Sequence, residues 1–129
     1  MGGLAIGVRG VAAVTVGPEN TARALGSGDV PTFGTPALVA LMEQAAVVAV
    51  AGGLEPGETT VGTWLEIAHL AATPAGAVVR AEAELVAIEG RKLTFSVVAH
   101  DGRQKIGEGR HQRMRVARDR FLSKLGPAL

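Results

Sequence analysis

The chain has 129 residues, of which 47% are hydrophobic and 19% are charged, and its formal net charge is +1. This length and composition are typical of a single globular domain over residues 1–129 with a sizeable core. The near-neutral charge and an aromatic content of 3% provide neither the positive field nor the stacking surfaces that nucleic-acid binding uses. Because cysteine is absent, disulfides, thiolate metal ligands and a cysteine nucleophile are excluded.

The first quarter of the chain is predicted to form a strand, a helical turn and a loop. Residues 4–16 are rich in small and β-branched residues and end at Gly17-Pro18, a pattern typical of a strand. Residues 18–34 contain several turn signals and little periodicity, which favours a short helical turn followed by a loop. The N-terminus lacks a cationic region followed by an apolar one, so we expect no signal peptide and a cytoplasmic location.

A long apolar helix is predicted next. From Pro36 to Ala51 every residue is apolar or small except Glu43 and Gln44. Thr35 can cap the first free amides of this helix, and Gly52-Gly53 supplies a stop signal. A helix that is apolar almost all round must be covered by other structure. It is short for a bilayer and carries a carboxylate, so a membrane span is not expected.

The rest of the chain predicts four strands joined by short antiparallel connections. Each segment alternates apolar and polar residues, and turn signals such as Asp101-Gly102 separate the segments. They are residues 58–76, with a break at Thr73-Pro74, then 77–90, 91–101 and 104–117, followed by an amphipathic tail over 118–129. In each of the first three of these strands, alternate residues are expected to share one face. In the first strand, if no bulge intervenes, they are Val61, Thr63, Leu65, Ile67 and His69. In the second they are Val79, Ala81, Ala83, Leu85 and Ala87, and in the third Leu93, Phe95, Val97 and Ala99.

One helix cannot cover both faces of a five-stranded sheet. The arrangement that buries the helix is a sheet curved around it, with the sheet edge or the open face closed by a second copy of the chain. The sequence therefore predicts an α+β protein with the hotdog fold, a curved antiparallel five-stranded sheet wrapped around one long central helix. The expected assembly is a homodimer or a dimer of dimers.

Glu43 is the most unusual residue of the predicted helix. Its helical neighbours are apolar, and no lysine or arginine lies three or four residues away to pair with it. An exposed stripe shared with Gln44 would explain the residue without a function. A carboxylate in apolar surroundings, however, is destabilised by desolvation, which suits a general base or a carboxylate nucleophile. We therefore interpret Glu43 as a site residue.

Three other residues could join Glu43 in a site. Thr35 precedes it by eight residues, about 12 Å along a helix axis, so the two would flank a substrate or meet across a dimer interface; helix capping alone would also explain Thr35. His69 ends a strand, where it could be an acid–base group or a core residue. Gly62 interrupts a strand, as at a bulge or a close approach of a ligand, and its amide could stabilise an oxyanion.

The other two histidines give a weaker signal. His100 lies beside a turn and is expected to be solvated. His111 lies in the basic stretch 110–115 and is expected at a solvated or phosphate-facing strand edge. The three histidines do not have the spacing of metal ligands, so no metal site is expected.

These residues resemble the fluoroacetyl-CoA thioesterase-like branch of the hotdog superfamily. The likeness covers most of the chain from about Phe33 to Val116, and the intervals of eight and twenty-six residues agree with those of that family's Thr/Glu/His catalytic set. The matching stretches are Phe33-Gly34-Thr35, Leu41-Met42-Glu43, Val61-Gly62-Thr63 through His69, Ala71-Ala72-Thr73-Pro74, Glu89-Gly90-Arg91, Ala99-His100-Asp101-Gly102, and Ile106-Gly107-Glu108-Gly109 with His111 and Arg113.

The resemblance implies an acyl-CoA thioesterase that releases a free acid and coenzyme A and needs no cofactor. Glu43 would attack the thioester carbonyl or activate water, and His69 would move protons. Thr35 would position the thioester or the base, and the amide of Gly62 would stabilise the oxyanion. Phe33, which adjoins Thr35, would contact the substrate.

One segment departs from the family pattern. The namesake enzyme carries phenylalanines as an acyl gate before the helix, whereas residues 25–34 here contain only Phe33. Gly26 and Asp29 fall near the gate positions. The expected substrate is therefore a general short-chain acyl-CoA rather than fluoroacetyl-CoA alone.

The last predicted strand is basic, and two rival functions are compatible with the predicted fold. Arg113, with Arg110 and Arg115, could contact the phosphates of coenzyme A, but the pattern favours a solvated strand edge. A hotdog enoyl-CoA hydratase would need an aspartate and a histidine close together in one loop, and no such pair lies near the helix. A non-catalytic acyl-CoA-binding or regulatory module would keep the pocket without hydrolysis.

Overall fold

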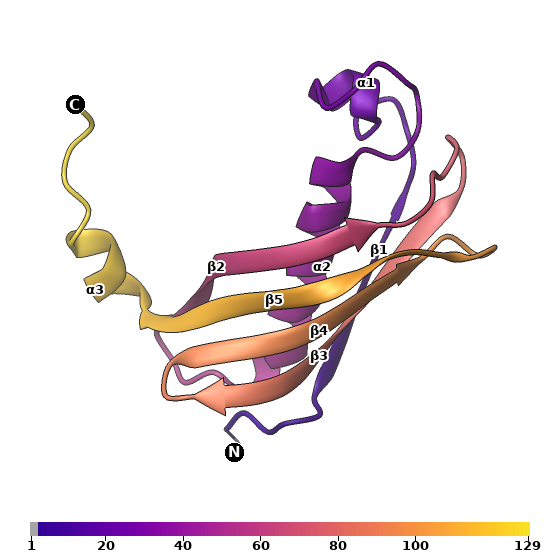
Figure 1. Ribbon diagram of the computed structural model, residues 1–129. Helices are drawn as coiled ribbons and strands as arrows, with labels where there is room; N and C mark the ends of the chain where they lie inside the picture. Colours follow the sequence, from indigo (N-terminus) through magenta and orange to yellow (C-terminus); the bar gives the residue numbers. More distant parts are fainter. Residues whose placement is uncertain (1–2) are drawn as a thin grey trace.

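Five strands and one long helix make up most of the computed structural model, which describes residues 3–129 (Figure 1). Met1 and Gly2 lie outside the described residues. They are the first residues of the predicted domain and of the N-terminus in which no signal peptide is expected. In chain order the elements are β1 (Arg9–Thr15), α1 (Ala22–Leu25), α2 (Thr35–Val50), the 3-10 turn η1 (Ala51–Gly53), β2 (Glu58–His69), β3 (Val78–Glu89), β4 (Lys92–His100), β5 (Lys105–Ala117) and α3 (Arg118–Ser123).

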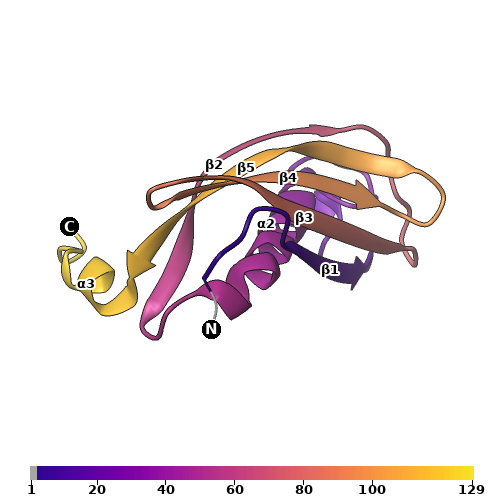
Figure 2. The same ribbon diagram turned by 90° about the horizontal axis from the view of Figure 1, so that it is seen from below.

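The five strands form one antiparallel sheet in the order β1-β3-β4-β5-β2. The sheet arches over α2, which lies against its concave face (Figure 2). Strands β1 and β2 are the two edges of the sheet, and α3 projects beyond the end of β5 (Figures 1 and 2). The predicted hotdog fold is confirmed.

The core lies between α2 and the concave face of the sheet. Alternation along β3 and β4 buries every second side chain, because successive residues of a strand point to opposite faces. The buried residues are Val79, Ala81, Ala83 and Leu85 from β3, Leu93, Phe95, Val97 and Ala99 from β4, and Leu38, Leu41, Met42, Ala45, Ala46 and Val50 from α2. The common faces predicted for these two strands are confirmed except at Ala87, which a register shift after Leu85 moves out of the row.

Helix α2 is covered on one face only. Its opposite face stays exposed in the single chain, although it is largely apolar: Pro36, Ala40, Gln44, Val47 and Val48. The sequence predicts that this helix is covered by other structure, with the open face closed by a second copy; in one chain only the face toward the sheet is covered. The segment Thr35–Gly53 is long and apolar enough to cross a membrane, but six of its side chains are packed in the core, which identifies it as the central helix of the fold.

Two strands differ from the sequence-based prediction. Strand β1 begins at Arg9 rather than at residue 4, because the chain turns at Gly7, whose φ of 100° favours glycine. In β2 the pairing with β5 shifts between Gly62 and Trp64, so Thr63 is an extra residue at a β-bulge. The bulge breaks the alternation, and Val61 and Thr63 therefore do not share a face with Leu65, Ile67 and His69.

Candidate active site

Thr35 and His69 meet at one end of the molecule. The N-cap of α2 is Gly34, and no side chain of the described residues caps the helix; Thr35 is the first helical residue. Its hydroxyl instead lies 2.7 Å from Nδ1 of His69, the last residue of β2. The expectation that Thr35 caps the helix is wrong, and the expectation that it faces a site with His69 fits this contact.

A shallow cavity opens beside this pair. It has a volume of about 360 Å³ and is lined by Phe33, Thr35 and His69 together with Thr32 and residues 70–72. The side chain of Phe33 is buried and forms a wall, while Thr35 is exposed to solvent. Three of the residues singled out from the sequence therefore line one cavity.

The electrostatic state of His69 follows from its surroundings. Burial lowers the pKa of His69 below its ordinary value of 6.5, and the nearby backbone of Ala71 opposes this shift in part. Its Nε2 is buried and has no hydrogen-bond partner within residues 3–129. The imidazole is therefore neutral near pH 7.

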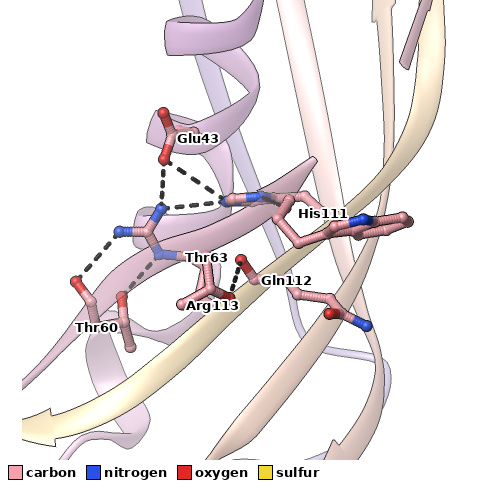
Figure 3. A network of polar contacts seen from close by, with 7 residues as sticks. Glu43, Thr60, Thr63, His111, Gln112 and Arg113 are labelled. Atoms are coloured by element: carbon pink, nitrogen blue, oxygen red, sulfur yellow. Dashed lines mark hydrogen bonds and ion pairs between the residues drawn. The ribbon is translucent and has the colours of Figure 1, made fainter. Parts of the chain in front are cut away.

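Glu43 lies in a second cluster, about two turns further along α2 (Figure 3). Its Oε2 accepts a hydrogen bond of 3.0 Å from Nη1 of Arg113 on β5, and Nε2 of His111 lies 3.9 Å away. The Glu43 side chain is 40% exposed. The premise of an unpaired carboxylate in apolar surroundings is thus wrong, because an arginine distant in sequence reaches it.

Arg113 is held firmly in place. Its side chain is 7% exposed, its Nε donates to Oγ1 of Thr60 at 2.9 Å, and its Nη2 donates to the Thr60 carbonyl at 3.1 Å. Because the guanidinium is buried and engaged with Thr60, Glu43 and His111, it does not fit the role of binding coenzyme A phosphates. His111 is also buried, at 1% exposure, so the expectation of a solvated strand edge is wrong for both residues.

Sequence reasoning missed this cluster for a physical reason. The pairing that joins Glu43 to Arg113 spans seventy residues and depends on which face of β5 points inward. His111 and Arg113 are two residues apart in one strand and therefore share a face, which could have indicated that both point inward toward Glu43. Of the other cations of this strand, Arg115 pairs with Glu58 at 2.9 Å and Arg110 is exposed.

Gly62 lies directly against Glu43. It faces the helix just before the bulge in β2, and a β carbon at this position would overlap Oε2 of Glu43. Only glycine therefore lets the carboxylate come this close to the strand backbone. The bulge that glycine at this position indicated is present, and the role of the Gly62 amide as an oxyanion donor stays a prediction.

The two clusters are separated within one chain. Thr35 and Glu43 are eight helical residues apart, about 12 Å, and Gly62 and His69 lie about 20 Å apart along β2. Both clusters border the exposed face of α2 and the free edge of β2. Among residues 3–129 no group of three or more histidine, aspartate or glutamate side chains is placed to hold a metal ion.

Comparisons with known proteins identify the family. A family model described as fluoroacetyl-CoA-specific thioesterase (FlK) matches residues 16–119. A fluoroacetyl-CoA thioesterase from Streptantibioticus cattleyicolor is 46% identical over 93 residues, which cover 72% of this chain and 67% of that protein. The crystal structure of a point mutant of the fluoroacetyl-CoA-specific thioesterase FlK matches with a TM-score of 0.89 at 39% identity, covering 96% of both chains. The mutant in complex with fluoroacetate and CoA gives a TM-score of 0.85 at 40% identity, covering 92% of this chain and 99% of that one.

Fold, site and relatives together define a thioester hydrolase with the hotdog fold. The resemblance seen in the sequence is confirmed, since the family model spans most of the chain. The chain belongs to the fluoroacetyl-CoA-specific thioesterase family.

Proposed function

We propose that this protein hydrolyses short-chain acyl-CoA thioesters to a free acid and coenzyme A. The observation that carries the proposal is the pairing of Glu43 with Arg113 directly beside the Gly62 backbone. This arrangement holds a carboxylate oxygen next to a strand backbone that can face a carbonyl group. The neutral Thr35–His69 pair supplies a second group that can exchange protons.

The roles of the residues follow from these contacts. In hydrolysis the carbonyl carbon gains an oxygen from water, the C–S bond breaks, and one proton of water ends on the sulfur of coenzyme A. Glu43 either removes a proton from the attacking water or attacks the carbonyl carbon itself, forming an anhydride that water then cleaves. The amide of Gly62 donates to the oxyanion that forms in either case.

His69 acts as a neutral base in this scheme. If its Nδ1–H donates to Oγ1 of Thr35, the lone pair of Nε2 is left free, and that atom has no other partner among residues 3–129. Nε2 would then accept a proton from water and return it to the departing thiolate, and because this atom is buried in the single chain, a local rearrangement must expose it to the substrate. Thr35 orients the ring, as the third member of a catalytic triad does. The reaction needs no cofactor.

We further propose that the active unit is a homodimer formed through β2, which could pair again as a dimer of dimers. Among residues 3–129 no strand pairs with the outer edge of β2, Trp64 on this strand is 44% exposed, and the neighbouring face of α2 is apolar. Antiparallel pairing of two β2 edges would place the Gly62 half of one strand opposite the His69 half of the other. The two clusters that are separated in one chain would then meet to form each of two equivalent sites.

We propose that the enzyme accepts short acyl groups and does not strictly select fluoroacetyl-CoA over other short acyl-CoAs. The family likeness leads us to expect an acyl gate before α2, but Gly26 and Asp29 are small or polar, and the segment around them is exposed. The cavity beside Thr35 and His69 is of modest size, which suits a small acyl group. Because acyl-CoA thioesters are intracellular metabolites, we propose a cytoplasmic location.

A panel of acyl-CoAs tests the proposed function. We expect purified protein to release free thiol from acetyl-CoA, propionyl-CoA and fluoroacetyl-CoA, measured with a thiol reagent and by mass spectrometry of the acid. Binding of acyl-CoA without thiol release would support a binding module instead. A product hydrated at the acyl chain, with its thioester intact, would support a hydratase.

A further inference from the structure

His111 is a buried titratable residue that the proposed reaction does not use directly. It lies on β5 with 1% of its surface exposed, and its ring stacks on Phe95 of β4 with centroids 6.0 Å apart. The charged groups that face it are Arg113 on its own strand and Glu43 on α2. From β2 it meets the backbone carbonyl of Trp64, and from β4 the uncharged ring of Phe95.

The two hydrogen bonds of His111 fix its tautomer. Nδ1 lies 2.8 Å from the carbonyl oxygen of Trp64, which can only accept, so Nδ1 carries the hydrogen. Nε2 lies 3.1 Å from Nη1 of Arg113, which can only donate, so Nε2 carries the lone pair. Burial lowers the pKa of His111, Arg113 adds to this effect, and the Trp64 carbonyl and Glu43 oppose it. The ring is thus neutral in the Nδ1–H form.

In this tautomer the lone pair of Nε2 of His111 accepts a hydrogen bond from Arg113 and helps to hold the guanidinium in place (Figure 3). The two hydrogens of Nη1 are shared between Nε2 of His111 at 3.1 Å and Oε2 of Glu43 at 3.0 Å. Thr60 holds the other side of the guanidinium. Protonated His111 would present an N–H to Nη1, repel Arg113 and compete with it for the Glu43 carboxylate.

We propose that neutral His111 is a positioning residue, which holds Arg113 so that its guanidinium fixes the Glu43 carboxylate against Gly62 in the reactive geometry. The inference rests on the proposed function of Glu43. His111 touches neither substrate nor reacting atoms in this scheme and acts only through Arg113. Its bond to the Trp64 carbonyl also ties the bulge of β2 to the same network.

Paired substitutions test this role. His111→Phe keeps a flat ring on Phe95 but removes the acceptor for Arg113, and should lower kcat about 10- to 100-fold with KM nearly unchanged, because a small misplacement of a catalytic group has effects of this size. His111→Gln places an amide oxygen near the position of Nε2 and should recover most of kcat. Wild-type kcat in a folded Phe variant, or a folded Gln variant as slow as Phe, would overturn the proposal.

Two readouts separate this proposal from failure of the proposed function and from simple instability. The acid limb of log kcat/KM should have a slope smaller by about one in His111→Gln than in the wild type, because one group that must be neutral is removed. Nitrogen NMR of the wild type should show His111 as the Nδ1–H tautomer, and an Nε2–H tautomer would contradict the proposal whether or not the protein hydrolyses thioesters.

If His111→Phe does not fold, His111→Asn replaces it. The shorter amide of asparagine cannot reach Arg113, so this variant should have a low kcat where His111→Gln is active.

Discussion

Replacing Glu43 with glutamine should lower kcat for acyl-CoA hydrolysis by at least about 10²- to 10⁴-fold, the range that loss of a general base produces. The substitution is close to isosteric, and the amide oxygen can still accept from Arg113. The chain should therefore keep its fold and its oligomeric state. What it loses is the negative charge that removes a proton from water or attacks the carbonyl carbon.

The control is Glu89→Gln, the same change at an exposed carboxylate at the end of β3 that pairs with Lys92. Its kcat should equal that of the wild type, and both variants should have the circular dichroism spectrum and melting temperature of the wild type to within a few degrees. Near-normal turnover by folded Glu43→Gln would remove Glu43 from the reaction.

Replacing His69 with alanine should lower kcat by about 10²- to 10⁴-fold as well, because the base that exchanges protons with water and thiolate is lost. The pH dependence of the wild type gives an independent check. Only neutral His69 is active, and burial lowers its pKa, so activity should persist as the pH falls through 6.5 and decline only below that value. An acid limb centred above 6.5 would contradict this role.

Thr35 provides the matched control for His69. Thr35→Ser keeps the hydroxyl that lies 2.7 Å from Nδ1 and should retain most of the activity. Thr35→Val has nearly the same shape but cannot hydrogen-bond, and should lose about tenfold or more because the ring is no longer oriented. Equal activity of the Ser and Val variants would show that the contact does not matter for the reaction.

The sequence predicted the fold well because the fold depends on local patterns. The period-two alternation of β3 and β4 and the apolar run of α2 are set by neighbouring residues, and one helix with five strands leaves few arrangements. The bulge at Thr63 was foreseen only as a possibility raised by Gly62, since glycine in a strand marks such a site without fixing the register. It decides which residues of β2 face α2.

The site was predicted less completely because its contacts are long-range. Thr35, Glu43, Gly62 and His69 were singled out by type and spacing, and they lie in two groups at the open side of the molecule. The partner of Glu43 could not be found by searching its own helix, since Arg113 comes from β5 and is buried there. A basic stretch suggested a solvated edge, whereas the strand lies inside the sheet between β4 and β2.

The central claim is that each site combines Glu43 of one chain with His69 of a second copy. The most direct measurement uses the two inactive variants, Glu43→Gln and His69→Ala, co-expressed with different affinity tags and purified as the mixed dimer. One of its two sites would then contain both intact residues, so the mixed dimer should show about half the activity of the wild-type dimer, while each parent stays inactive. A mixed dimer as inactive as its parents would contradict the account.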